Sequence, residues 1–486
     1  MLWLRRSLLR RRPLVPSPSS TPTCDALQSR SRMAPTRFKL LLVLGTAAIL
    51  GTLVILHTPG LNGPWYWQWR WQWIDSLRLY PAMLAATVPF FLGQWLHARD
   101  PGRTTAAIGL VMLSTLCLEL TAAGMHRKPF DLGGVADAIR DPGATGYFTD
   151  AANLVRRGIP LRGWMSTYAE RMPRFHNHAR FKPPGLLLYH MAFIKLLGPA
   201  RLTALVAGLS LAILATCSVA ATYLLILKLC GQREAAFCGA SFFALCPSLV
   251  LFLPQFDQVY PAIACAMIGL WAVALAAGSA RYAVGFGAVM AFACFLSQMF
   301  LVLGIFLAAL ALRQVAQTGR PGLARVVRYA VMAILTVVSI YALLWLSTGY
   351  DPIATYRTAS GLLVDFLPLI PERPYPVHVA FDLLDFALGS GWISFLLVAY
   401  FLLGRSEGSA PSRELALLAV CQVLVSAALG LVPGETARTW MLMYPLLMIP
   451  IGLELAGWDA LARLAVYGAL CFLLAALTQN MGFVVQ

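Results

Sequence analysis

About thirteen apolar segments, most of them close to the length of a membrane-crossing helix, divide this chain of 486 residues. A helix needs about 20 mainly apolar residues to cross the hydrocarbon layer of a bilayer. The chain is 59% apolar and only 12% charged, whereas soluble globular proteins carry about 25% charged residues. The sequence therefore predicts an all-α integral membrane protein with about 13 transmembrane helices. The predicted spans are residues 39–58, 78–97, 104–124, 201–227, 234–253, 259–277, 281–297, 299–313, 329–347, 379–402, 414–432, 440–457 and 464–481.

The basic residues that give the formal net charge of +17 lie in short clusters between apolar runs. This pattern is typical of cytoplasmic loops and of contacts with lipid phosphates, so we expect membrane lipids and no nucleic acid as partners. Alternation of the spans places the Arg-rich N-terminus on the same side as four basic loops. The positive-inside rule then predicts a multi-pass protein with a cytoplasmic N-terminus, which we expect in the cell inner (plasma) membrane. The four loops are His97–Arg103, Lys228–Glu234, Arg313–Arg328 and Arg405–Arg413.

The N-terminal region differs in composition from the rest of the chain. Residues 1–38 contain eight Arg and one acid, Asp25, and we predict a basic, disordered cytosolic tail. Residues 39–103 hold two spans that precede the first long polar loop. Residues 104–486 form the remaining transmembrane domain. The ten Cys residues are scattered, nearly all of them inside apolar runs, with no CxxC or Cys/His ligand spacing, so we expect small buried side chains rather than disulfides or a metal site.

The segment between the third and fourth spans is polar. From Met125 to Lys182 it contains ten Lys/Arg, five Asp/Glu and three His, although the topology places loop 125–200 outside, where the charge rule disfavours basic residues. Long loops translocate largely regardless of charge, so these charges need another explanation. We interpret the segment as an external active-site loop with short juxtamembrane helices. The last of these, Pro183–Pro199, is short and begins with Pro-Pro, which favours a helix on the membrane surface.

Two acids in this loop are candidate catalytic residues. Asp141 precedes Pro-Gly and a helical stretch, Ala151–Arg157, which Gly158 and Pro160 end. An acid before Pro-Gly is also an ordinary turn signal, so Asp141 could simply cap a turn. Asp150 could instead complement the dipole of the helix that follows it.

A cluster of cationic and titratable side chains ends the loop. If the stretch is extended, His176, His178, Arg180 and Lys182 all point to one face. That face suits a phosphate or pyrophosphate, which Arg binds bidentately and Lys meets as a point charge. Arg174 adds a further cation. A solvated loop near anionic headgroups is the alternative interpretation. The two His could also bind a metal, but no paired carboxylate lies nearby, so we predict no metal site; a divalent cation is possible but is not indicated.

A third group lies in the turn Pro433–Trp440, between the predicted spans 414–432 and 440–457. Glu435 and Arg438 are three residues apart and could pair with each other, or Arg438 could bind an anion. Asp382 and Asp385, near the external end of their helix, could line the same cavity, since ionisable residues within membrane spans usually face the protein interior.

The order of these motifs resembles the GT-C superfamily of polytopic glycosyltransferases, and is most similar to its dolichyl-phosphate-mannose protein mannosyltransferase and aminoarabinose transferase branches. Members carry an external first loop with an acid, then a Tyr and a small-residue helix, then a Lys/His-Pro-Pro segment. Asp141, Tyr147, Ala151–Gly158 and Lys182–Gly185 match in that order, and Gly434–Trp440 is similar to a late turn of the family. The resemblance spans about residues 104–457, and it implies that residues 104–486 form a GT-C-like transmembrane catalytic domain. The two N-terminal spans depart from the family by preceding the loop.

The resemblance implies an inverting enzyme that transfers a sugar from a polyprenyl-phosphate-linked donor to a lipid- or glycan-linked acceptor at the external face, without a cofactor. Asp141, or alternatively Asp150, would be the general base. Lys182 and Arg180 would stabilise the departing phosphate. His176, His178 and Arg174 of the loop, and Arg438 of the late turn, would assist them. Tyr147 and Glu435 would contact the substrate. The alternatives are a transporter or flippase of lipid-linked sugars, a glycan polymerase or ligase, and a non-catalytic assembly subunit.

Overall fold

The computed structural model describes residues 22–63, 69–126, 130–366, 375, 377–404 and 410–482. Helices make up nearly all of the regular structure. The long helices are α1 (Pro22–Ile55), α2 (Ser76–Arg99), α3 (Thr104–Met125), α9 (Arg201–Cys230), α12 (Tyr260–Ala277), α13 (Ala280–Leu296), α14 (Gly304–Thr318), α15 (Arg320–Thr348), α16 (Pro352–Phe366), α19 (Ala410–Ala428) and α22 (Ala460–Asn480). The shorter helices are α4 (Gly133–Arg140), α5 (Tyr147–Arg156), α6 (Leu161–Met165), α7 (Tyr168–Arg171), α8 (Gly185–Leu197), α10 (Arg233–Ala244), α11 (Pro247–Leu251), α17 (Val377–Ser390), α18 (Ile393–Leu403), α20 (Thr436–Thr439) and α21 (Tyr444–Ala456).

A small two-stranded sheet joins two segments that are distant in sequence. Strand β1 (Arg70–Trp71) pairs antiparallel with β2 (Met481–Gly482), with Arg70 opposite Gly482. The side chain of Gln72 extends this contact by donating to the carbonyls of Thr478 and Met481. The linker after α1 is thereby attached to the end of α22.

The prediction of a multi-pass membrane protein is confirmed, whereas the predicted number of about 13 spans is matched only in part. Within the described ranges nine helices are long and apolar enough to cross a membrane, and a bent pair brings the number to ten. The other predicted spans are helical but short or interrupted: α13 and α21 have 17 and 13 residues, and 234–253 is divided into α10 and α11. Pro247 starts α11, and the residue before a proline avoids the helical conformation, which accounts for the break there.

The predicted span 379–402 is not one straight helix. Its two halves, α17 and α18, meet at an angle of 101°. Gly391 and Trp392 both have positive φ at the break, 87° and 56°. An L residue rarely adopts this conformation within a helix, so the chain turns here. The bend brings α17 across the end of the bundle, where its two acids lie.

The predicted N-terminal tail is only partly described. Residues 1–21 lie outside the described residues, and residues 22–38 belong to α1. Ala, Leu, Arg and Met in this stretch have high helix propensity, which favours extension of the apolar helix toward the N-terminus.

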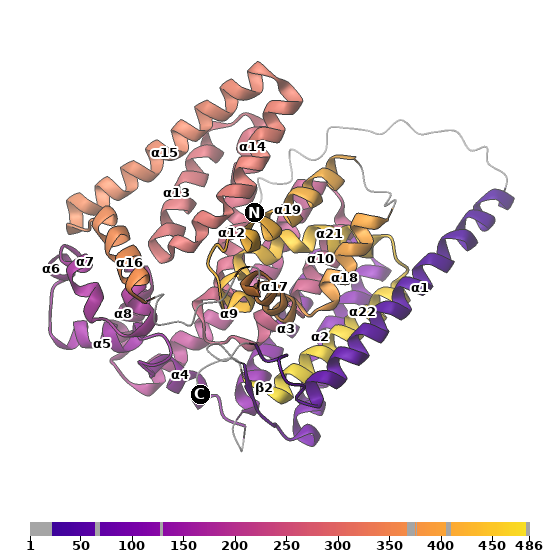
Figure 1. Cartoon of the computed structure of the whole chain (residues 1–486), viewed down its shortest axis with the longest axis horizontal. Coiled ribbons are helices and arrows are strands. Elements are labelled where there is room, and N and C mark those ends of the chain that lie inside the picture. The colour runs from indigo at the N-terminus through magenta and orange to yellow at the C-terminus, as the bar shows by residue number, and fades with distance from the viewer. Residues whose placement is uncertain are drawn as a thin grey trace.

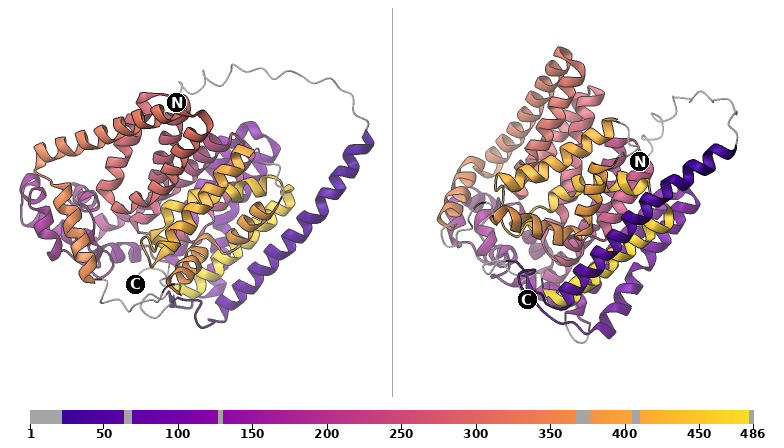
Figure 2. Two further views of the ribbon diagram at one scale, coloured as in Figure 1. Left: turned by 45° about the horizontal axis from the view of Figure 1, so that its top comes forward. Right: turned by 45° about the vertical axis from the view of Figure 1, so that its right-hand side comes forward.

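The helices form a bundle in which segments far apart in sequence lie side by side. Helix α1 runs along α22, and α22 in turn packs against α2 (Figures 1 and 2). Helices α13, α14 and α15 form a group at one edge, at the upper left of Figure 1. Along α15 the apolar side chains are largely exposed, as for Val331 at 48%, Ile334 at 60% and Leu346 at 64%. Apolar side chains exposed along a whole helix fit a lipid environment.

Polar contacts sort the helix ends into two groups that match the predicted sides. At one end, which we call the loop end because it carries residues 130–200, Lys182 contacts Ser297 and Arg438 contacts Gln255. At the opposite end, which we call the basic end, Lys39 donates to Glu454 and Arg313 pairs with Glu414. Each contact joins residues that the alternation of spans places on one side. The grouping agrees with the predicted alternation of the spans.

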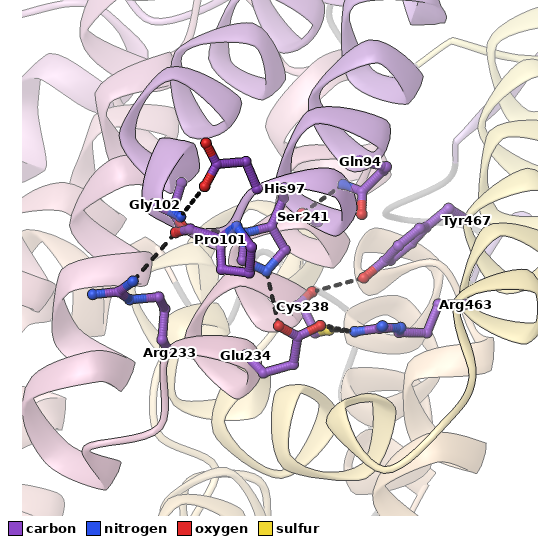
Figure 3. Close-up of polar contacts among 12 residues, drawn as sticks. Gln94, His97, Pro101, Gly102, Arg233, Glu234, Cys238, Ser241, Arg463 and Tyr467 are labelled. Atoms are coloured by element: carbon purple, nitrogen blue, oxygen red, sulfur yellow. Dashed lines mark hydrogen bonds and ion pairs between the residues drawn. The ribbon is translucent and has the colours of Figure 1, made fainter.

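A polar network at the basic end fastens three helices together (Figure 3). His97 of α2 is buried; its Nε2 lies 2.8 Å from a carboxylate oxygen of Glu234 in α10, and its Nδ1 lies 3.0 Å from Thr104 Oγ1. Arg463 of α22 donates to the other oxygen of Glu234. Phe237 stacks on the His97 ring at 3.8 Å. Glu234 therefore serves as the common acceptor for α2 and α22.

Glu234→Ala should lower the thermal stability of the detergent-purified protein. The substitution leaves a buried imidazole nitrogen and a partly buried guanidinium without their acceptor, which costs about 1–3 kcal/mol. Thermal unfolding followed by intrinsic fluorescence measures the change. Glu414→Ala is the matched control, because the Glu414 side chain is exposed to a similar extent, 47% against 41% for Glu234, but its ion pair with Arg313 includes no buried histidine among the described residues. Exposed ion pairs contribute about 0–1 kcal/mol. Equal losses in the two variants would contradict this role of the network.

Candidate functional site

The segment 176–182 is folded onto the loop that precedes α5. The Asn177 side chain donates to the carbonyls of Gly143 and Ala144, at 2.6 and 2.8 Å, and the Ala179 amide lies 3.1 Å from the Thr145 carbonyl. Gly146 begins α5 with φ of 80°, and a Cβ there would come within 2.7 Å of His176. Only glycine permits both this backbone and this close approach. The segment is thus placed by backbone contacts. It is 3₁₀-helical over Asn177–Phe181, so the condition of an extended stretch, on which the four side chains would share one face, is not met.

Asp150 fixes the start of this segment. It is 4% exposed, and both of its carboxylate oxygens face His176: one accepts from the His176 backbone N–H at 2.8 Å, and the other lies 2.7 Å from ring Nδ1. The His176 side chain itself is 44% exposed. Because His176 engages both oxygens, the geometry gives Asp150 a role in holding the loop. Its predicted place in the first turn of α5 is confirmed.

Lys182 reaches from this segment toward the break between α13 and α14. Its Nζ lies 3.0 Å from Ser297 Oγ and 2.8 Å from Met299 Sδ, while Tyr168 donates to its backbone carbonyl at 2.8 Å. Burial lowers the pKa of Lys182 to about 8, with Asp257 acting in the opposite direction. A partly dehydrated amine of this kind gains more from an added anion than a surface lysine does.

Arg438 lies on α20, and the charges of Asp257 and Glu435 act on both Arg438 and Lys182. Its guanidinium donates to Glu435, which makes the pairing predicted for these two residues a fact of the structure. Arg438 Nε is 3.8 Å from Asp257 Oδ2, and its NH1 is 3.5 Å from Gln255 Oε1. Both Arg438 and Asp257 are largely buried, with side chains 12% and 13% exposed. Burial acts to lower the pKa of Arg438, but Glu435 and Asp257 outweigh it and raise the pKa, so the charge is permanent.

We refer to Lys182, Arg438, Asp257 and Glu435 as the cation pocket. His178 borders it: burial and then the charges of Arg438, Lys182 and Arg180 hold the pKa of His178 well below its ordinary value, so the imidazole is neutral. Tyr147 also borders it and is 5% exposed; burial and the charge of Asp257 raise its pKa, so the phenol keeps its proton. The pocket thus offers two cations balanced by two acids, together with neutral donors. This arrangement can bind a phosphate-like anion by displacing the acids.

The remaining predicted residues lie in different surroundings. Asp141 caps the end of α4, is partly exposed, and accepts from the Gly143 amide at 2.8 Å, so the predicted turn is confirmed. Arg174 is exposed at the end of a short 3₁₀-helix (Met172–Arg174). Arg180 is partly buried, with its guanidinium 4.6 Å from the centre of the Phe181 ring. The pocket therefore gathers Lys182, His178, Tyr147, Glu435 and Arg438, and leaves Arg174 at the surface.

Asp382 and Asp385, which the sequence suggested could line the same cavity, accept hydrogen bonds from the turn that carries Arg438. The Gly434 amide donates to Asp382 at 3.0 Å, and the Ala437 amide donates to Asp385 at 2.6 Å. Backbone N–H groups in a turn of positive φ, here Gly434 and Glu435, can converge on an acid in this way.

Sequence reasoning missed Asp257 and Ser297. Asp257 belongs to a short 3₁₀-helix (Phe256–Val259) that leads into α12, and Ser297 follows α13. Both residues lie at the end of a predicted span, on the predicted external side. This position was the sequence signal that could have identified them. Across the residues described, no group of three or more His, Cys, Asp or Glu is arranged to hold a metal ion.

No family model matches the chain, and no curated protein matches it in sequence.

Lys182 should react with an amine-directed reagent at lower pH than an ordinary lysine. Its pKa of about 8 makes half of the amine neutral, and therefore nucleophilic, near that pH, against about 10.4 for an ordinary lysine. Labelling of the purified protein across pH 6 to pH 10, read by peptide mass spectrometry with free lysine as the internal standard, gives the midpoint. A midpoint equal to that of free lysine would contradict the buried environment.

Proposed function

We propose that the chain is a membrane glycosyltransferase that moves a sugar from a polyprenyl-phosphate-linked donor to an acceptor, with inversion, at the loop end. The observation that carries the proposal is the cation pocket, in which Lys182 and Arg438 meet at the end of an apolar bundle. A donor of this class brings a phosphate on a lipid chain, so its charge and its tail need such a boundary. The resemblance of the motif order to the GT-C superfamily points the same way.

The leaving group is assigned to the cation pocket. When the bond between the anomeric carbon and the phosphate oxygen breaks, negative charge grows on the phosphate, and fixed cations nearby stabilise it in a water-poor site. Lys182 and Arg438 supply these charges, and Arg180 lies along the same segment. Glu435 and Asp257 balance the cations until the phosphate takes their place.

The general base is assigned to Asp141. Inversion places the attacking acceptor and the leaving group on opposite faces of the sugar. Asp257, at 3.8 Å from Arg438, lies on the side of the leaving group. Both oxygens of Asp150 face His176. Asp141 is partly exposed, and the Gly143 amide contacts one of its two oxygens, which suits a carboxylate that takes the proton of an acceptor hydroxyl as that oxygen attacks.

A transporter of lipid-linked sugars is the second candidate, and one observation favours it. Glu119 in α3 is fully buried, and neither of its oxygens has a hydrogen-bond partner among the described residues. Ionisable residues within membrane spans often mark transport pathways. The bent pair α17–α18 also has the form of a broken transporter helix, although its acids bond to the turn. Reconstituted vesicles that move lipid-linked sugar between leaflets without transferring it would favour this candidate.

Asp141→Asn should reduce sugar transfer by about 100-fold or more, the usual contribution of a general base, and leave the affinity for farnesyl phosphate nearly unchanged. Membranes supplied with a panel of radiolabelled polyprenyl-phosphate monosaccharides provide the assay. The control is Asp137→Asn, one helical turn earlier, because Asp137 pairs with Arg201 on the surface. Full activity of Asp141→Asn would refute the assignment of the base.

The affinity for farnesyl phosphate should fall as the pH rises through about 8. Below that pH the Lys182 amine is protonated and attracts the phosphate, and above it the charge is lost. Lys182→Arg should remove this pH dependence, because a guanidinium stays charged, and Lys182→Gln should weaken binding about tenfold at pH 7. Titration of detergent-purified protein measures both effects. Equal binding by the wild type and Lys182→Gln at pH 7 would exclude Lys182 from the anion site.

A further inference from the structure

The turn that carries Arg438 is held by an acid whose other oxygen bonds to a distant part of the chain. Asp385 Oδ2 accepts from the Ala437 amide at 2.6 Å. The Thr436 hydroxyl lies 3.2 Å from the same oxygen and 2.5 Å from the Asp382 carbonyl, which is the nearer acceptor for its single proton. Asp385 Oδ1 accepts from the indole N–H of Trp69 at 2.8 Å. The carboxylate thus accepts one N–H from the turn and one from a residue 316 positions away in sequence.

Each partner of Asp385 is itself fixed. Trp69 is 2% exposed, its ring meets the Phe252 ring edge-on at 5.8 Å, and its backbone amide donates to Asn62 at 2.8 Å. The Asp385 side belongs to α17, which the bend at Gly391 brings across the loop end. Because Trp69 and α17 are both held in place, the Asp385 carboxylate couples the position of the turn to that of the linker after α1.

This turn also determines the direction of Arg438. Ala437 precedes Arg438 directly, and Ser248 donates to the Ala437 carbonyl at 2.7 Å. With its amide and its carbonyl both bonded, Ala437 has little freedom to rotate. A displacement of about 1 Å at a binding group is enough to lower the efficiency of a preorganised site.

The geometry points to Asp385 as the positioning residue of the cation pocket, with Trp69 as the partner that orients its carboxylate. By motif order alone, the two N-terminal spans are an addition to the catalytic domain. Through Trp69 in the linker between them, they supply part of the support of the site. The effect on phosphate binding rests on the proposed function, whereas the positioning of the turn does not.

Asp385→Asn tests the assignment because an amide has one acceptor where the carboxylate has two. If the amide oxygen faces Ala437 and Thr436, the NH₂ group faces the Trp69 N–H, and two donors oppose each other. We expect faster hydrogen exchange at the amides of residues 434–438 and about tenfold weaker binding of farnesyl phosphate. The matched control is Asp365→Asn, which makes the same change at an exposed position on α16.

The double variant Trp69→Phe/Asp385→Asn supplies the decisive comparison. Removing the indole N–H removes the opposing donor, so the double variant should protect residues 434–438 and bind farnesyl phosphate better than Asp385→Asn alone. Independent losses of stability would add and make the double variant worse. An additive result, or unchanged exchange in Asp385→Asn, would overturn the inference.

Two further outcomes are also decisive. If the wild type does not bind farnesyl phosphate, the proposed function fails, and hydrogen exchange alone decides the positioning. If Asp385→Asn does not yield folded protein, Trp69→Phe replaces it. That variant keeps the bonds of Asp385 to the turn and removes the orienting donor, so exchange at residues 434–438 should rise about threefold; no rise would overturn the inference.

Discussion

Two like charges that act on each other at the end of an apolar bundle are the constraint on which the loop end of this protein depends. Lys182 and Arg438 repel each other and are both partly dehydrated, as the low pKa of Lys182 records. Burying such cations costs several kcal/mol per ion unless acids compensate them. Asp257 and Glu435 provide that compensation. The surrounding structure then has to hold four charged groups that arrive from three separate segments.

The protein meets this requirement with backbone bonds rather than with further charges. The Lys182 segment is held by Asp150, by Asn177 and by the donation of Tyr168 to the Lys182 carbonyl. The Arg438 turn is held by Asp382 and Asp385, which accept its backbone amides. In both cases a buried carboxylate outside the pocket fixes a piece of main chain that carries a cation into it. Such support keeps binding groups in place before a ligand arrives, which reduces the loss of entropy on binding.

The two ends of the bundle use polar groups differently. At the basic end, Glu234 joins His97 to Arg463 and leaves no acceptor over, as expected of a structural fastening. At the loop end, Arg438 Nε is buried without a hydrogen-bond partner among the described residues. A cation with a donor still to satisfy is suited to an incoming anion, whereas the Glu234 network is complete. This contrast is the physical reason to place the proposed chemistry at the loop end.

The sequence by itself determined the apolar spans, their alternation and the grouping of their ends, because these depend on local composition and on counting helices. It also selected Lys182, Arg438 and Glu435, since charge stands out between apolar runs. It could not assign Asp150 to His176, Asp257 to Arg438 or Trp69 to Asp385. Those pairs are 26, 181 and 316 residues apart, and whether they meet depends on how the helices pack. The bend at Gly391 likewise depends on the positive φ of Gly391 and Trp392, which the apolar pattern of this span does not reveal. The tertiary structure alone therefore decided which acids support the site and which enter it.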